Sequence, residues 1–359
     1  MKKDKSGLFG VSGKSNRDTT RKSHWGKNEF NSSFPTALLC YMHSIGKKAI
    51  YLKMDKQLKI YHDTLSTRDL FQIEPTDPEI YFSFEDAFSP FQGYVRGQLP
   101  RSDVVIMDNS DKKNPMRKGF EVKLTALPDS STFEEADDKQ SCEMVFRPTA
   151  IVHLALSISH LFVNRKKELS NILSPVCSKV FNWRSPEDIA MLTSEFIEAL
   201  NKAFITLIDD QEAFIIQPIW KTIGKASVLH ENCLDVFIWS NFAFTRLFFD
   251  SVANGAPKRK MTRQQRCIFW LGRMLYDFAQ NEYLNPALIA SEMAYKLQTD
   301  KAFSVSGVKS WNYLKCAELT KPRISKKEIR NIILGNGYKL LSPERRFDAA
   351  LVNTPGLFD

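Results

Sequence analysis

Three residues on two strand-like runs have the types and spacing for metal-assisted chemistry. Asp103 leads into an apolar run at 104–106, and Glu121 and Lys123 lie on a second run. Because residues i and i+2 of a strand point to the same face, Glu121 and Lys123 are expected side by side. If the two strands pair, the Asp103 carboxylate comes close to Glu121, and two hard oxygen donors suit Mg²⁺. The pattern is the layout of a metal-dependent nuclease, with Asp103 and Glu121 holding Mg²⁺ and Lys123 orienting the attacking water.

An Asp followed by Glu-x-Lys is a common pattern, so its context matters. The alternative interpretation is a pair of ordinary solvated strand faces. Both parts of the pattern lie on apolar, β-branched runs, which favours the nuclease interpretation. Glu85 is a candidate third carboxylate, although its neighbours fit a solvent-facing strand position equally well.

A helix and several strands are expected around these residues. Ser32 or Ser33 is predicted to cap a helix with Pro35 in its first turn, which runs to about Ser44. Strand-like runs follow at residues 49–53, 58–62 and 79–84. A helix and then a meander that includes Asp103 and Glu121 resembles the αβββαβ core of PD-(D/E)XK nucleases.

The rest of the chain alternates buried strands with longer helices. Strands are predicted at 143–147, 213–220 and 234–238, and helices begin at Pro148, Ser185, Arg263 and Pro286. The predicted fold class is therefore α/β (α+β), a central mixed sheet flanked by helices with a mainly helical C-terminal elaboration. We expect a basic N-terminal arm at 1–30, the catalytic core with inserted helices at 31–255, and a mainly helical region at 256–359 that is a possible DNA-contacting subdomain.

Several long strings in one order resemble the HindVP family of type II restriction endonucleases. They begin with Ser15-Asn16-Arg17-Asp18 and the run from Trp25 to Pro35, and continue with Leu99-Pro100-Arg101-Ser102-Asp103, the run from Gly119 to Asp129, and Glu231-Asn232-Cys233-Leu234-Asp235-Val236-Phe237. These strings are far more specific than the Asp and Glu-x-Lys pattern alone. One departure from the motif's name is that Ser102 precedes Asp103 and the proline is Pro100.

The resemblance implies a fold, an activity and partners. It implies a PD-(D/E)XK nuclease fold, Mg²⁺-dependent cutting of both strands of DNA within a short palindrome, and a DNA methyltransferase that protects the host. It also suggests a degenerate hexamer of the GRCGYC type. Because a palindrome repeats about a two-fold axis, we expect a homodimer in which each protomer cuts one strand. The rival interpretations are a sequence-nonspecific nuclease of this fold and a non-catalytic DNA-binding protein.

Candidate contacts to DNA come from three basic or polar segments. Each also fits a solvated face. The first two are a basic arm reaching DNA and the approach to the first motif strand, and the third is a basic loop that leads into a helix. The candidates are Lys27, Asn28, Asn31, Arg101, Lys258, Arg259, Lys260, Arg263 and Arg266.

Composition agrees with this interpretation, and motifs of several other enzyme classes are absent from the sequence. The chain has 359 residues, is 43% hydrophobic and carries a formal net charge of +9, which favours a polyanionic partner. Its six cysteines form no C-x-x-C pair, and its six histidines show no metal-ligand spacing. His153 and His160 fall in an apolar helix, where a core role is favoured. No Walker A loop or G-x-S-x-G elbow is present, which disfavours a P-loop ATPase and a serine hydrolase. No secretory signal or membrane-spanning run is found, so a cytoplasmic protein is expected. The resemblance to restriction endonucleases implies that the cell is prokaryotic.

Overall fold

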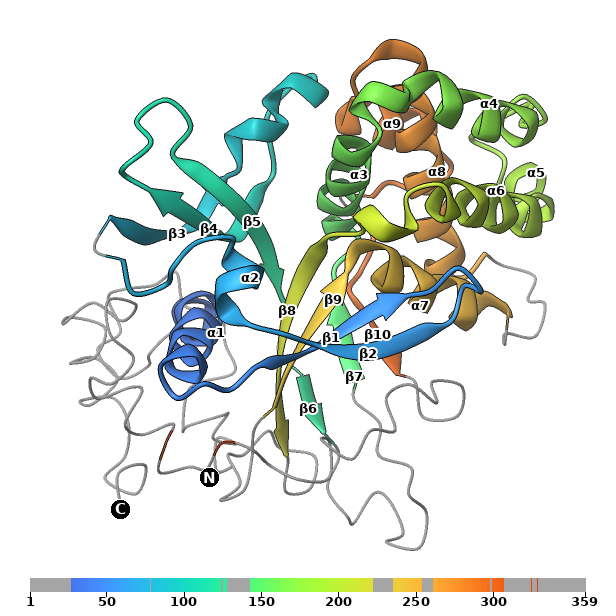
Figure 1. The fold of residues 1–359 in the computed structure, drawn as a ribbon. Coiled ribbons are helices and arrows are strands. Elements are labelled where there is room, and N and C mark those ends of the chain that lie inside the picture. Colours follow the sequence, from blue (N-terminus) through green and yellow to red (C-terminus); the bar gives the residue numbers. More distant parts are fainter. Residues whose placement is uncertain are drawn as a thin grey trace, which may run out of the picture.

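The computed structural model describes residues 27–77, 79–123, 125–127, 143–221, 235–253, 261–297 and 299–306, together with residues 324 and 328. Within these ranges the chain forms a mixed sheet with helices on both faces (Figure 1). The α/β class and the mixed sheet flanked by helices that the sequence predicts are confirmed.

The main sheet has the order β2-β1-β9-β8-β5-β4-β3, with β6 beside β8. β1 pairs with β9 in parallel, as do β5 and β6 with β8, and the other pairs of this sheet are antiparallel. A second sheet joins β7 to β10. The strands are β1 (Ala49–Met54), β2 (Ile60–Leu65), β3 (Ile80–Ala87), β4 (Arg101–Asp108), β5 (Met116–Val122), β6 (Thr125–Leu127), β7 (Glu143–Phe146), β8 (Ala213–Lys221), β9 (Asp235–Ser240) and β10 (Phe303–Ser306).

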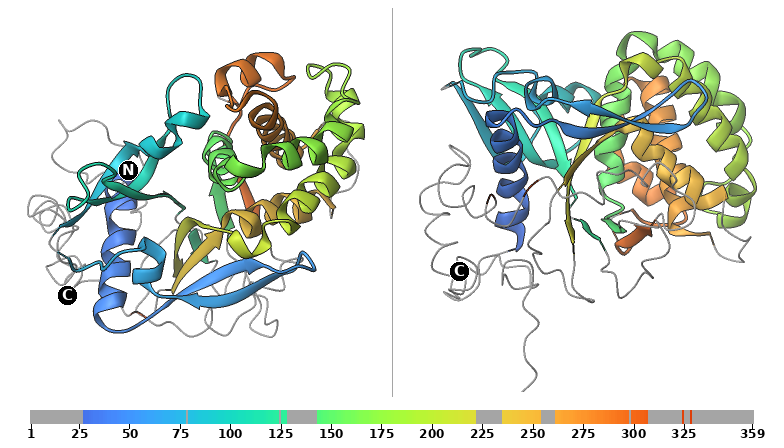
Figure 2. Two further views of the ribbon diagram at one scale, coloured as in Figure 1. Left: turned by 45° about the horizontal axis from the view of Figure 1, so that its top comes forward. Right: turned by 60° about the horizontal axis from the view of Figure 1, so that its bottom comes forward.

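Helices lie on the two faces of the sheet in unequal numbers. The helices are α1 (Lys27–Ser44), α2 (Thr67–Phe71), α3 (Ala150–Leu161), α4 (Lys166–Cys177), α5 (Pro186–Met191), α6 (Thr193–Ile205), α7 (Asn241–Ala253), α8 (Arg263–Asn281) and α9 (Pro286–Glu292). α1 and α2 share a core with one face, while α3, α4, α6, α7 and α8 share a larger core with the other (Figures 1 and 2). Along the chain, α1 is followed by the β1-β2 hairpin, α2 and the β3-β4-β5 meander, and a helix and then a meander is the order that the sequence predicts. Strand β8, which comes after α3 to α6, pairs with β5 in parallel.

Alternation along the strands explains the two cores. In β1, Ile50 and Leu52 belong to the larger core, whereas Ala49 and Tyr51 belong to the smaller one. Val122 in β5 faces the smaller core with α1. Its neighbour Glu121 therefore faces the layer that contains α3, as the period of two requires.

Capping residues fix several helix starts where the sequence predicts them. The Ser185 side chain accepts a hydrogen bond from the Asp188 backbone N–H, and Pro186 occupies the first position of α5. The start of α1 is different. The predicted cap at Ser32 or Ser33 is wrong, because α1 begins at Lys27 and contains Pro35 in its interior. Proline removes one backbone hydrogen bond there, a cost of about 3 kcal/mol that the buried packing of the helix offsets.

Candidate active site

Asp103 and Glu121 meet where β4 begins and β5 ends. The antiparallel register aligns Val104 with Phe120, so the next residues, Asp103 and Glu121, are cross-strand neighbours. The Asp103 carboxylate accepts a hydrogen bond of 2.7 Å from the Val122 backbone N–H, which fixes its orientation. The structure thus brings together the two carboxylates that the sequence singles out.

Lys123 lies between these two carboxylates. Its Nζ is 2.8 Å from Glu121 Oε2 and 3.5 Å from Asp103 Oδ2, and it also donates to the Val122 carbonyl at 3.2 Å. Its backbone N–H donates to the Ile216 carbonyl of β8 at 3.0 Å, which holds the end of β5 against the next strand. One ammonium group therefore occupies a position on which two carboxylates converge.

Burial makes the charges in this cluster interact strongly. The side chains of Glu121, Lys123 and Asp103 are 7%, 13% and 27% exposed. Burial, only partly opposed by the Lys123 charge, raises the pKa of Asp103. Burial acts in the same direction on Glu121, but the charges of His153 and Lys123 outweigh it and lower the pKa of that carboxyl. Burial also opposes the charge of Lys123, yet Glu121 and Asp103 raise its pKa above the ordinary value. The cluster therefore keeps an ionised Glu121 beside a cationic Lys123.

The oxygen atoms of this cluster suit a hard divalent cation. Asp103 Oδ2 and Glu121 Oε2 converge on the ammonium group, the Val122 carbonyl is directed at it too, and a cation of higher charge would bind the same donors. In the part of the chain that the structure describes, no three His, Cys, Asp or Glu side chains gather into a ready-made ligand set. Two carboxylates, completed by substrate phosphate and water, match the way in which Mg²⁺ binds at phosphate-processing sites.

Glu85 lies opposite Asp103 in the register of β3 and β4. Phe84 pairs with Val104 and Asp86 pairs with Ser102, which places Glu85 and Asp103 at the same level. The charge of Glu85 contributes to the raised pKa of Asp103, after burial and the nearer charges. Glu85 is exposed and has a φ of 54°, a left-handed conformation that costs about 1–3 kcal/mol for a residue other than glycine. Its role as an accessory carboxylate stays a prediction.

His153 is an additional residue at the site. It lies on α3, is buried, and its Nε2 is 3.3 Å from Glu121 Oε1. The interpretation of His153 as a core residue with a satisfied polar group agrees with its burial, but the group that satisfies it is the candidate catalytic glutamate. The sequence contains one signal for this contact, an ionisable residue within an otherwise apolar helix.

The predicted DNA contacts occupy different surroundings. Arg101 is exposed at the first position of β4, two residues before Asp103. Lys27, Asn28 and Asn31 belong to the first turns of α1. Lys258, Arg259 and Lys260 lie outside the described residues. All of them stay predictions.

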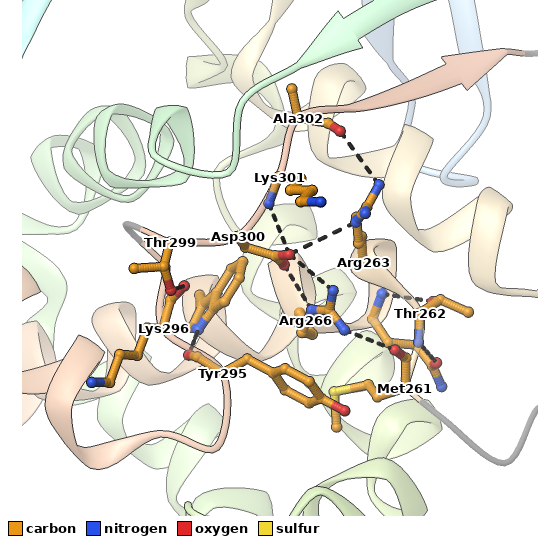
Figure 3. A network of polar contacts seen from close by, with 12 residues as sticks. Met261, Thr262, Arg263, Arg266, Tyr295, Lys296, Thr299, Asp300, Lys301 and Ala302 are labelled. Carbon is orange, nitrogen blue, oxygen red and sulfur yellow. Dashed lines mark hydrogen bonds and ion pairs between the residues drawn. The ribbon is translucent and has the colours of Figure 1, made fainter.

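Arg263 and Arg266 of α8 belong to an intramolecular network (Figure 3). Arg266 Nε and Nη2 donate to the Asp300 carboxylate at 2.7 and 3.1 Å, and Nη1 donates to the Met261 carbonyl at 3.0 Å. The guanidinium also stacks over the Tyr295 ring, 4.1 Å from its centroid. Arg263 is 3.7 Å from Asp300 and donates to the Ala302 carbonyl at 3.3 Å. Arg266 is therefore already bound to a carboxylate, whereas Arg263, 38% exposed, is more accessible to a phosphate.

Comparison with known proteins identifies the family. The family model described as HindVP restriction endonuclease matches residues 25–358. The chain belongs to this family. It is similar to the type II restriction enzyme HgiDI of Herpetosiphon aurantiacus, with 43% identity over 355 residues that cover 98% of this chain and 97% of the relative. It is also similar to the probable type II restriction enzyme HindVP of Haemophilus influenzae, with 36% identity over 352 residues that cover 98% of this chain and 94% of the relative. No solved structure matches the chain.

Membership of the HindVP restriction endonuclease family confirms the predicted family and enzyme class. The match spans the β3-β4-β5 meander and the helices that pack on it. Among the described residues, none of the helices is both long enough and apolar enough to cross a lipid bilayer.

Proposed function

We propose that the chain is a type II restriction endonuclease that makes Mg²⁺-dependent, sequence-specific double-strand cuts in DNA in the cytoplasm of a prokaryotic cell. The observation that carries the proposal is the convergence of Asp103 and Glu121 on Lys123 at the junction of β4 and β5. Family membership supports the reaction class.

The proposed reaction is the hydrolysis of a phosphodiester. The oxygen of a water molecule bonds to phosphorus, the bond between phosphorus and the 3′ oxygen breaks, and the 3′ oxygen takes up a proton. A bound Mg²⁺ would lower the pKa of the water and stabilise negative charge on the phosphate. Asp103 and Glu121 would hold that ion. Lys123 would donate to a phosphate oxygen and orient the attacking water, because its Nζ lies beside both carboxylates.

The symmetry of a palindromic site suggests how the protein assembles on DNA. A two-fold symmetric site is matched by two copies of the chain, so we propose a homodimer in which each protomer cuts one strand. A degenerate hexamer of the GRCGYC type is the proposed site. A methyltransferase that modifies the same site is the proposed functional partner, with no physical contact implied. Lys27, Asn28, Asn31, Arg101, Lys258, Arg259, Lys260, Arg263 and Arg266 are the proposed DNA contacts, and Arg101 and Arg263 are favoured by their exposure.

The proposed function is tested with a plasmid of known sequence. We expect purified protein to yield discrete fragments with Mg²⁺ and intact plasmid with EDTA, because the reaction needs the ion that Asp103 and Glu121 hold. Sequencing of the fragment ends gives the recognition site, the cut position and the overhang. A smear of fragments would favour a nonspecific nuclease. Plasmid that is bound but never cut, with any divalent metal, would indicate a non-catalytic DNA-binding protein.

Glu85 is proposed as an accessory carboxylate that helps to hold the metal beside Asp103. The variant Glu85→Gln removes its charge and is expected to lower the cleavage rate at limiting Mg²⁺ by up to about tenfold, because a group that supports a metal ligand has an effect of this size. Saturating Mg²⁺ should restore most of the rate. The control is Glu79→Gln, an exposed glutamate just before β3. Equal cleavage rates for Glu85→Gln and the wild type at every Mg²⁺ concentration would contradict the proposed role of Glu85 as an accessory carboxylate.

A further inference from the structure

The two oxygen atoms of Glu121 have different partners. Oε2 accepts from Lys123 Nζ at 2.8 Å, on the side of Asp103, while Oε1 faces His153 Nε2 of α3 at 3.3 Å. The contact is within ion-pair distance, and because an ionised carboxylate has only acceptor atoms, the imidazole is the group that can supply a proton between them. The plane of the Glu121 carboxylate is therefore defined from two sides, by its own strand and by a helix on the adjacent layer.

We propose that His153 is a positioning residue for the DNA cleavage reaction, which holds Glu121 Oε1 so that Oε2 stays directed at the metal position beside Asp103. The proposal rests on the proposed nuclease function. His153 acts through Glu121, and no contact between His153 and DNA is part of the proposal.

The location of His153 makes it a rigid support. Residues 150–159 of α3 are all buried, which fixes the helix against the sheet and the other helices. One turn beyond His153, Ser157 Oγ accepts a hydrogen bond of 3.1 Å from Asn241 Nδ2 at the start of α7. Because α3 is held by these other contacts, loss of the His153 imidazole is expected to release Glu121 without moving the helix.

A cavity beside this contact has room for water, which would take the place of the His153 imidazole in a variant that lacks it. Its volume is about 110 Å³, and Glu121, His153 and Ser157 are among the residues that line it. This volume accommodates water, because a cavity needs only about 10–15 Å³ on this measure to hold one molecule. Without the imidazole, Oε1 could bond to mobile water instead of a fixed donor. Supporting partners of metal ligands contribute about 10- to 100-fold to metal affinity or activity, so the expected effect is measurable.

The test compares two variants at position 153 and one control on the same helix. His153→Leu removes the donor, whereas His153→Gln keeps an N–H donor on a side chain of similar reach. His160→Leu is the control for loss of an imidazole from α3, because His160 lines the same cavity but is exposed, and its Nδ1 contacts the Tyr94 hydroxyl at 3.2 Å. Binding of Mn²⁺ is followed by the loss of the signal of the free ion in electron paramagnetic resonance. Single-turnover cleavage is measured against Mg²⁺ concentration, and thermal unfolding is recorded for each variant.

We expect His153→Leu to weaken Mn²⁺ binding about tenfold and to raise the Mg²⁺ concentration for half-maximal cleavage by a similar factor. His153→Gln should recover most of both losses, and His160→Leu should match the wild type. Unchanged metal binding in His153→Leu would overturn the proposal. So would equal losses in both His153 variants with a lowered unfolding temperature, which is the result of a purely structural role. If the wild type itself neither binds Mn²⁺ nor cuts DNA, the nuclease proposal fails, and this one fails with it.

Discussion

Replacing Lys123 with alanine is expected to lower the single-turnover rate of DNA cleavage by about 10²- to 10³-fold while site-specific binding survives. Lys123 Nζ lies 2.8 Å from Glu121 and 3.5 Å from Asp103, and its removal takes the cation away from a buried and a partly buried carboxylate. The charge that develops on the phosphate then loses a donor. Glu121→Ala should have an effect at least as large, because it removes a metal ligand. Binding is measured in Ca²⁺ or EDTA, so that cutting does not interfere.

The matched control for Lys123→Ala is Lys118→Ala on the same strand. Lys118 forms an ion pair with Glu212 at 3.3 Å and is buried to a similar extent, with 12% of its side chain exposed. A loss in Lys123→Ala that Lys118→Ala does not share is therefore specific to the site. Cleavage at the wild-type rate in Lys123→Ala or Glu121→Ala would sink the assignment of the catalytic residues. Loss of binding together with cleavage would indicate misfolding instead.

Replacing Arg266 with methionine is expected to lower the free energy of unfolding by about 3–5 kcal/mol. The Arg266 and Asp300 side chains are each 12% exposed and are joined by two hydrogen bonds. Removal of the guanidinium leaves the Asp300 carboxylate buried without this partner, and desolvation of an uncompensated charge is costly. Urea unfolding followed by circular dichroism measures the effect.

Two further variants separate a structural role of Arg266 from a DNA contact. Arg263→Met should cost much less stability, because Arg263 is more exposed and lies farther from Asp300. The double variant Arg266→Met with Asp300→Leu should recover stability, since it removes both charges together. If Arg266→Met keeps the wild-type stability but weakens the salt dependence of DNA binding, Arg266 contacts phosphate and the structural role is wrong.

Local patterns in the sequence predict much of the sheet and the heart of the site. The period of two in β5 predicts that Glu121 and Lys123 share a face, and the structure confirms it, with both side chains on the same carboxylate cluster. Starts such as Ser185 before α5 and Asn285 before α9 follow from capping chemistry that acts within four residues. These features depend on neighbours in the chain, which is why sequence reasoning finds them.

Contacts between distant residues are not predicted in the same way. The contact of His153 with Glu121 depends on how α3 packs over β5, and the pairing of Arg266 with Asp300 depends on how the chain returns after α9. The parallel pairing of β1 with β9 is equally invisible in either strand alone. The start of α1 at Lys27 is a further difference, because Pro35, which predicts a first turn, lies in the interior of the helix. Such contacts depend on tertiary packing between distant parts of the chain. The spacing of residues along one sequence gives no signal for them.

The strands β8 and β9 join two parts of the sheet that come from earlier in the chain. The β1-β2 hairpin lies on one side of this pair, and the β3-β4-β5 meander lies on the other. During synthesis on a ribosome, the β1-β2 hairpin and the β3-β4-β5 meander emerge before β8 and β9. Each therefore has an unpaired strand edge until β8 and β9 are synthesised. The end of β5, where Lys123 bonds to Ile216, is completed only at that point. A nascent or truncated chain that ends before β8 therefore lacks the strand that completes the cleavage site. Its unpaired strand edges are expected to bind chaperones or to aggregate.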